Sequence, residues 1–120
     1  MGGTSEIQAV TLELHGFLAQ RLAALGRPRG TRRLVEVPAR RGESVGALLA
    51  RLAATDDRYT LLYDTAADRL PEHVEAVLND RVLDLQGGLN ARLSPGDVLS
   101  FLPAHAGGGL MAGVGGQADG

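Results

Sequence analysis

The hydrophobic positions of the chain follow two periods, one typical of strands and one typical of helices. Val10, Leu12 and Leu14 alternate with polar or small residues, which is the pattern of a half-buried strand. The same alternation recurs between residues that break regular structure, in segments 34–37, 74–78, 81–83 and 98–102. We therefore expect about five strands, and we expect the second to end at Pro38.

A helical period marks the middle of the chain. Apolar residues recur there at intervals of three and four, and these are Val45, Leu48, Leu49, Leu52 and Ala53. Ser44 precedes them at the position that caps the free backbone amides of a helix. This segment predicts one long helix with a wholly apolar face.

Shorter segments connect these elements. Residues 17–25 predict a short helix ended by Gly26, and residues 59–63 predict one more helical turn. Residues 27–33 combine Arg, Pro and Gly and are expected to form a basic loop, whereas residues 85–93 are expected to form a compact loop.

The predicted order is strand, short helix, strand, long helix, strand, strand, loop and strand. A single long helix can cover one face of a mixed sheet, so the fold class is α+β in two layers. A chain of 120 residues and 12.5 kDa is expected to form one domain. The aromatic fraction of 3% indicates an aliphatic core.

The residue types that are absent exclude several kinds of site. The sequence contains no Cys, which excludes disulfides, thiolate metal sites, cysteine nucleophiles and cysteine lipidation. No apolar run reaches membrane-spanning length, and the first residues lack the basic and apolar segments of a signal peptide. We expect a cytoplasmic protein without a membrane partner.

Charge is distributed unevenly along a chain of net charge −2. Residues 1–55 carry eight Arg against four Glu, whereas residues 56–120 carry four Arg against ten acidic residues. The basic loop could attract phosphates, but a pI of about 5.9 and the scarcity of aromatic side chains argue against nucleic-acid binding. A solvated loop or a contact with an acidic protein is expected instead. Because every basic residue is Arg, no lysine can accept an isopeptide bond.

No group of side chains in the sequence suggests catalysis or metal binding. His15, His73 and His105 lie at no local spacing typical of metal ligands. Asp56 and Asp57 follow the long helix and are expected to be solvated. We assign no catalytic residue and no metal ligand.

The residues after the last predicted strand have the composition of a tail that could enter a narrow channel. They read Leu102-Pro103-Ala104-His105-Ala106-Gly107-Gly108-Gly109. Proline ends the strand, and small residues then lead to glycines. Because glycine has no Cβ, a Gly-Gly segment fits a channel too narrow for any side chain.

The order and spacing of several short motifs resemble the prokaryotic ubiquitin-like sulfur carriers, which include the small subunit of molybdopterin synthase, the thiamine sulfur carrier and the mycobacterial carrier for cysteine synthesis. The motifs are Val35-Glu36-Val37-Pro38, Val45-Gly46-Ala47-Leu48-Leu49, Val77-Leu78-Asn79-Asp80, Gly87-Gly88-Leu89, Pro95-Gly96-Asp97 and Leu102-Pro103-Ala104-His105-Ala106-Gly107-Gly108. The resemblance implies a ubiquitin-like β-grasp domain over residues 7–108, with a mixed sheet of about five strands, one main helix and a short helix after the first strand.

The resemblance also implies a carrier protein with no catalysis of its own, or the small non-catalytic subunit of a synthase. In this family, a partner related to ubiquitin-activating enzymes uses ATP to adenylate the second glycine, which then becomes a thiocarboxylate and donates sulfur to a synthase subunit. Gly107 and Gly108 match this pair. Partner contacts are expected along Pro103, Ala104, His105 and Ala106, and at the outward positions of the last strand, Val98 and Ser100.

The sequence departs from this family because residues 109–120 follow Gly108. We expect these residues to form a disordered extension, and we hypothesise that a protease, for example a zinc metalloprotease, cuts between Gly108 and Gly109. Gly115-Gly116 and Gly120 are alternative reactive ends. Two other functions stay open, a protein-binding module whose tail is permanently blocked and a ubiquitin-like modifier that is joined to other proteins.

Overall fold

The computed structural model describes residues 7–104, so the predicted tail after Ala104 and the predicted extension lie outside the described residues. In chain order, the elements are β1 (Ile7–Leu14), α1 (Phe17–Arg21), β2 (Arg27–Arg29), β3 (Arg32–Arg40), α2 (Val45–Thr55), the 3₁₀ helix η1 (Asp57–Leu61), β4 (Val74–Leu78), β5 (Arg81–Val82), the 3₁₀ helices η2 (Leu83–Gln86) and η3 (Gly88–Asn90), and β6 (Val98–Pro103).

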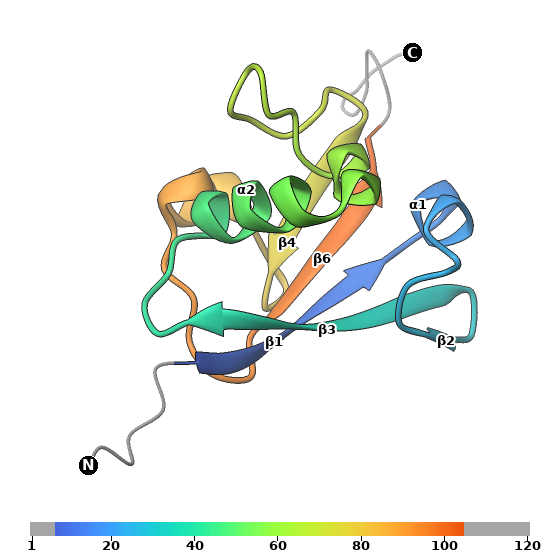
Figure 1. Cartoon of the computed structure of the whole chain (residues 1–120), viewed down its shortest axis with the longest axis horizontal. Helices are drawn as coiled ribbons and strands as arrows, with labels where there is room; N and C mark the ends of the chain where they lie inside the picture. The colour runs from blue at the N-terminus through green and yellow to red at the C-terminus, as the bar shows by residue number, and fades with distance from the viewer. Residues whose placement is uncertain (1–6, 105–120) are drawn as a thin grey trace.

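The strands form one mixed sheet in the order β2-β3-β1-β6-β4-β5. The central strands β1 and β6 are parallel, and the other neighbouring pairs are antiparallel. Helix α2 crosses one face of the sheet, and no helix formed by residues 7–104 covers the other face (Figure 1). The predicted α+β class, with one main helix on a mixed sheet, is confirmed, although the sheet has six strands.

The apolar face of α2 forms the core together with the inward side chains of the central strands. Val45, Leu48 and Leu49 are fully buried, as are Leu12 of β1 and Phe101 of β6. The Ser44 hydroxyl accepts a hydrogen bond of 3.1 Å from the backbone N–H of Ala47, so the predicted N-cap is present. Burial of each large aliphatic side chain stabilises the fold by about 1.5–3 kcal/mol.

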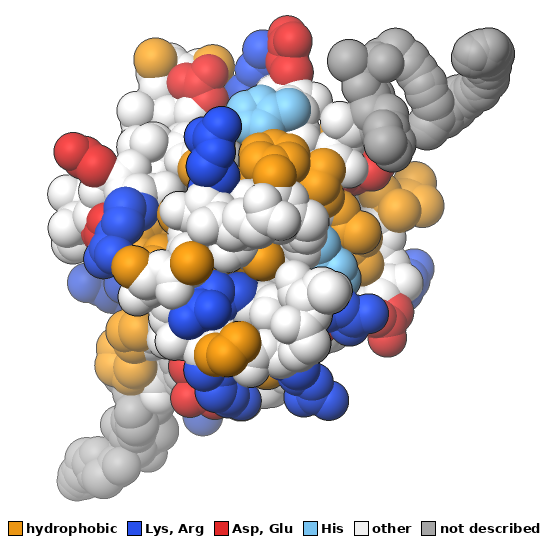
Figure 2. All heavy atoms as spheres, turned by 90° about the vertical axis from the view of Figure 1, so that its right-hand side faces the viewer, with side chains coloured by type: hydrophobic (Ala, Val, Ile, Leu, Met, Phe, Trp, Pro, Cys, Tyr) orange, Lys and Arg blue, Asp and Glu red, His pale blue; other side chains and the backbone are white. Residues whose placement is uncertain are grey.

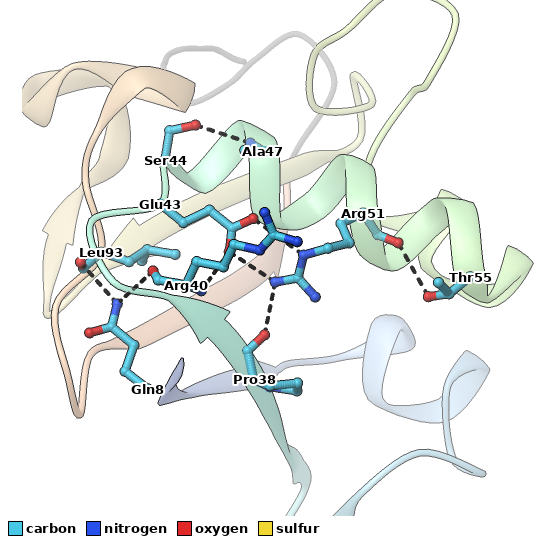
Figure 3. Close-up of polar contacts among 9 residues, drawn as sticks. All are labelled: Gln8, Pro38, Arg40, Glu43, Ser44, Ala47, Arg51, Thr55 and Leu93. Carbon is cyan, nitrogen blue, oxygen red and sulfur yellow. Dashed lines mark hydrogen bonds and ion pairs between the residues drawn. The ribbon is translucent and has the colours of Figure 1, made fainter. Parts of the chain in front are cut away.

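A group of polar contacts joins the end of β3 to α2 (Figure 3). The Glu43 carboxylate accepts hydrogen bonds from the Arg51 guanidinium at 2.8 Å and from the Arg40 backbone N–H at 2.9 Å. The same guanidinium donates to the Pro38 carbonyl at 2.9 Å. Burial raises the pKa of Glu43, but the hydrogen bonds from Arg51 and Arg40 outweigh it, so this pKa lies below its usual value. These contacts fix the helix against the sheet.

Strand β3 does not end at Pro38, as the sequence predicted, but continues to Arg40. Pro38 pairs with Ala9 of β1, and β2 pairs with β3 only between Arg32 and Leu34. At Pro38 the side of β3 away from β1 is therefore an open edge. Proline is tolerated there because its missing N–H is not needed by a second strand.

Other boundaries also differ from the prediction. The basic loop contains the short strand β2, whose three residues are all exposed and so show no alternation. Helix α1 ends at Arg21, four residues before the predicted end, and a turn follows it. The predicted loop 85–93 overlaps two 3₁₀ helices, and Leu83, predicted in a strand, begins the first of them. None of the helices in residues 7–104 is long and apolar enough to cross a membrane.

Candidate functional site

The strand that precedes the predicted tail lies in the centre of the sheet. Thr11 to Leu14 of β1 pair with Val98 to Phe101 of β6, and Pro103 at the end of β6 pairs with Val74 of β4. The chain therefore leaves the sheet between β1 and β4. This position places the root of the tail on a rigid support.

Contacts on both sides hold the last described residues. On the β4 side, the Ala104 N–H donates a hydrogen bond of 2.8 Å to the His73 carbonyl. On the β1 side, the His15 N–H donates to the Phe101 carbonyl at 3.1 Å. Gly16 follows with φ of 59°, and a Cβ on this residue would lie 2.8 Å from Pro103 Cγ. The position of Pro103 therefore depends on the missing side chain of Gly16.

Two rings from different elements lie beside this exit. Phe17 begins α1, and His73 precedes β4, with ring centroids 5.7 Å apart and planes inclined by 34°. Hydrophobic and histidine side chains gather on this end of the molecule, whereas arginines dominate its lower part (Figure 2). Pro103 and Ala104 at the root of the tail therefore lie beside apolar side chains and beside the polar ring of His73.

A polar cluster occupies the centre of the open sheet face. Its acceptor is Glu13, which receives hydrogen bonds from Ser100 Oγ at 2.9 Å and from Arg32 Nη1 at 3.0 Å. His15 Nε2 lies 3.3 Å from Glu13 Oε1. Burial raises the pKa of Glu13, but the hydrogen bonds from Ser100, Arg32 and His15 outweigh it, and the pKa is lowered. Glu13 therefore accepts hydrogen bonds from Ser100 and Arg32, and the His15 ring lies beside them.

Apolar side chains lie around this cluster on the same face. Register places Val77 opposite Ser100 and Val82 opposite Val77, while Leu102 and Val98 flank Ser100 along β6. Val82 is 40% exposed, and the other three are half-buried. A contiguous apolar surface with a polar centre is typical of a protein-binding face.

The structure places only some of the predicted site residues. Val98 and Ser100 lie on the open face, and Pro103 and Ala104 form the root of the tail. His105, Ala106, Gly107, Gly108 and Gly109 lie outside the described residues. Their predicted roles stay predictions.

The sequence analysis missed Glu13, Arg32 and His15 as members of the face. The sequence pattern could have indicated Glu13 and His15, because both occupy the alternate positions of the first strand that face away from the core. They lie next to Ser100 only because β1 and β6 pair in parallel, and the alternation of apolar and polar residues does not predict which strands pair. Within residues 7–104, no group of three or more His, Asp or Glu side chains could hold a metal ion.

A family model matches most of the chain. The ThiS family model matches residues 27–108. No curated protein matches the sequence.

Several solved structures share the fold. The HVO 2177 protein of Haloferax volcanii is 20% identical, with a TM-score of 0.65 over 90% of this chain and 93% of that one. CysO of Mycobacterium tuberculosis is 23% identical, with a TM-score of 0.56 over 80% and 99%. The BexX/CysO complex of Amycolatopsis orientalis contains a chain that is 24% identical, with a TM-score of 0.53 over 82% and 99%. These similarities confirm the predicted ubiquitin-like β-grasp fold.

Proposed function

Because the chain belongs to the ThiS family, we propose that it is a sulfur carrier that reacts through the carboxylate of Gly108. In this proposal it works in the cytoplasm, where a partner adenylates Gly108 with ATP and converts it to a thiocarboxylate. The sulfur then passes to molybdopterin, cysteine or thiamine synthesis. The chain catalyses no reaction itself and serves as a carrier or as the small subunit of a synthase.

One observation carries this proposal, namely that the family match ends at Gly108, close to the anchored end of β6. Ala104 is held by His73, so four residues separate a fixed point from the reactive carboxyl group. Four extended residues span at most about 13–14 Å. This length is sufficient for the glycines to enter the active site of a partner while the sheet stays outside.

The proposed chemistry requires no catalytic group from this chain. The Gly108 carboxylate attacks the α-phosphate of ATP, which forms an acyl adenylate and releases pyrophosphate. A hydrosulfide equivalent supplied by a partner then displaces AMP from the carbonyl carbon and leaves the thiocarboxylate. Without side chains at Gly107 and Gly108, the partner can close around the carbonyl and exclude the water that would hydrolyse the adenylate.

The open sheet face is the proposed contact for the ubiquitin-activating-type adenylyltransferase and for the sulfur-accepting synthase subunit. Val98 and Leu102 supply apolar area next to the tail, and the Glu13 cluster supplies hydrogen-bonding groups that fix orientation. The solved complex of CysO with BexX supports the idea that proteins of this fold form such assemblies.

Maturation is the second part of the proposal, because residues 109–120 block the Gly108 carboxylate. We expect a protease, for example a zinc metalloprotease, to cut between Gly108 and Gly109. Gly115-Gly116 offers the alternative pair within the same chain.

The test is the intact mass of the protein purified from its own cells. We expect a species that ends at Gly108 and carries the mass increase of one oxygen replaced by sulfur. Gly108→Ala should abolish the sulfur-containing species, and Gly116→Ala is the matched control that should leave it unchanged.

Other outcomes of the same measurement would contradict the proposal. If only the chain ending at Gly120 is found, even when demand for sulfur is high, the protein is a binding module with a blocked tail. If Gly108 is found joined to other proteins and no thiocarboxylate is found, it is a modifier. Sulfur at Gly120 of the uncut chain would refute the maturation step.

A further inference from the structure

The pairing register places one row of side chains across the open face of the sheet. Residues directly opposite each other in paired strands point to the same face, and each strand contributes one residue to the row. From β5 to β2 these residues are Val82, Val77, Ser100, Glu13, Leu34 and Arg27. The open face therefore changes from apolar on the side of β4 and β5 to basic on the side of β2.

The basic side continues toward the end of the sheet from which the tail leaves. Arg29 of β2 is directly opposite Arg32 of β3, and each lies two positions from a member of the row, so both point to the same open face. The turn between β2 and β3 lies at this end because Arg33 pairs with Leu14, and Leu14 pairs with Phe101. On the side of the molecule that carries β2, arginines gather over the lower part (Figure 2).

The positive charge of this hairpin is only partly neutralised. Arg32 forms an ion pair with Glu13, in which Nη1 and Oε2 are 3.0 Å apart. Arg27 and Arg29 are exposed, and no ion pair or side-chain hydrogen bond within residues 7–104 involves either of them. Like charges directly opposite each other in a strand pair are destabilising, so Arg29 beside Arg32 lowers the stability of the hairpin. An acidic partner would remove this repulsion.

We propose that the open face binds a partner protein whose acidic surface contacts Arg27, Arg29 and Arg32 while an apolar part of the same partner contacts Val98 and Leu102. Neighbouring strands are about 4.7–4.9 Å apart, so β2 lies about 14–15 Å from β6 across the sheet. The partner carries Asp or Glu side chains at about this distance from its apolar contact. This inference rests on the proposed function for the use of the open face as a contact, and it adds the charge of the partner.

The residue types on this face favour a protein over a nucleic acid. Proteins that bind single strands combine basic groups with aromatic side chains on which the bases stack, and the outward strand residues within 7–104 include no Phe or Tyr. Glu13 and Glu36 also lie on this face. A protein can place single carboxylates against the arginines and keep them away from these two residues, whereas a nucleic-acid strand carries a charge at every phosphate.

The chain itself offers too little acidic charge to occupy this surface. Residues 105–120 contain one acidic residue, Asp119. In a second copy, the apolar side of the open face carries Glu75 as the acidic residue of β4. One carboxylate would then meet two arginines that have no ion pair, Arg27 and Arg29. A separate acidic partner supplies both the apolar contact and sufficient charge.

The test uses the ¹⁵N-labelled full chain and the blocked peptide Leu-Val-Ser-Gly-Ser-Glu-Asp-Glu at about millimolar concentration and low ionic strength. Its Val and its first Glu are four residues apart, which spans about 13–14 Å when extended. We expect amide shifts at Arg27, Arg29 and Arg32 and along Val98–Leu102. The peptide Leu-Val-Ser-Gly-Ser-Gln-Asn-Gln should bind about tenfold more weakly, and added salt should reduce this difference.

Paired variants separate this surface from the other arginines. Arg27→Gln with Arg29→Gln should weaken binding of the acidic peptide by about two- to fivefold per charge. The matched control is Arg41→Gln with Arg81→Gln, which removes the same charge from two exposed arginines outside this surface and should leave binding unchanged. Urea denaturation of Arg29→Gln should show a midpoint that is not lowered, because the repulsion from Arg32 is removed.

Several outcomes would overturn the proposal. These are equal binding of the two peptides, equal weakening by the two double variants, and shifts confined to other regions. A lowered urea midpoint for Arg29→Gln with unchanged peptide binding would show that this arginine supports the hairpin instead.

Two further outcomes would identify a different occupant and would also overturn the proposal. Tighter binding of a single-stranded oligouridylate at the same arginines would identify a nucleic acid, and shifts of these amides that depend on protein concentration would identify a second copy. The peptide test needs neither a free Gly108 carboxylate nor ATP. This proposal and the proposed carrier function can therefore fail separately.

Discussion

Replacement of Gly16 by Ala is expected to test whether the turn after β1 positions the root of the tail. Gly16 has φ of 59° and ψ of −136°, a conformation that residues with a side chain rarely adopt. Such a backbone conformation costs about 1–3 kcal/mol for a residue other than glycine. The added Cβ would also lie 2.8 Å from Pro103 Cγ, well inside the optimum of about 3.5–4.0 Å.

The contact with Pro103 should add to the backbone cost. Pro103 is paired with Val74, so its displacement disturbs the end of β6, and overpacking of this kind costs about 1–3 kcal/mol. Gly30 provides the matched control, because its φ is 62° but a Cβ there would have no atom within 4 Å. Gly30→Ala should therefore lose about 1–2 kcal/mol, and Gly16→Ala should lose at least about 1 kcal/mol more.

Urea denaturation measures this difference directly. We expect a lower midpoint for Gly16→Ala than for Gly30→Ala at an unchanged slope, and an additional decrease in Tm of about 3–6 °C per kcal/mol. The hydrogen bond from Ala104 to His73 should also weaken, which faster exchange of the Ala104 amide would report. Equal midpoints, together with unchanged Ala104 exchange, would refute the role of Gly16 in placing Pro103.

Two further predictions concern titrating groups away from the sheet face. The lowered pKa of Glu43 means that its contribution to stability is present above its usual value of 4.5 and is lost as the pH falls through the folded-state value. Glu43→Gln should therefore flatten the acid side of a plot of unfolding free energy against pH, and an unchanged plot would contradict this. The hydrogen bond to Asp68 raises the pKa of Tyr63 from 10.0 to about 12, so its contribution is lost as the pH rises through this interval. Phenolate absorbance should show this late ionisation, and Asp68→Asn should shift it to lower pH; ionisation near 10 in the unsubstituted protein would refute the interaction.

The main elements could be predicted because burial of one face makes apolar residues recur at the period of a helix or a strand. Each residue of α2 that faces the sheet is apolar, and β1 and β4 expose every second residue. Ser44 marked the start of the helix because the first backbone amides need an acceptor. Where one face of an element is buried and the other is solvated, the sequence pattern predicts whether the element is a helix or a strand.

The elements that were missed lack this asymmetry. All three residues of β2 are exposed, so the strand is specified by its pairing with β3 rather than by burial. The continuation of β3 past Pro38 depends on where β2 stops, which is a property of the sheet and not of the local sequence. Both cases need tertiary information that periodicity does not contain.

In the candidate site, too, the positions that depend on burial could be predicted and those that depend on strand pairing could not. The outward positions of β6 followed from alternation, and so Val98 and Ser100 could be named from the sequence. The partners of Ser100 could not, because Glu13 lies 87 residues earlier in the chain and meets it only through the parallel pair.

The central place of β6 has a consequence for the synthesis of the protein. The ribosome makes β1, β3 and β4 before residues 98–103 exist, so the sheet lacks β6, one of its two central strands, until these residues have emerged. Until then β1 and β4 have exposed edges that invite wrong pairing, and closure must bring distant segments together. Pro103 and Ala104 thus follow the strand that is synthesised last, so the hydrogen bond from Ala104 to His73 can form only after β6 has joined the sheet.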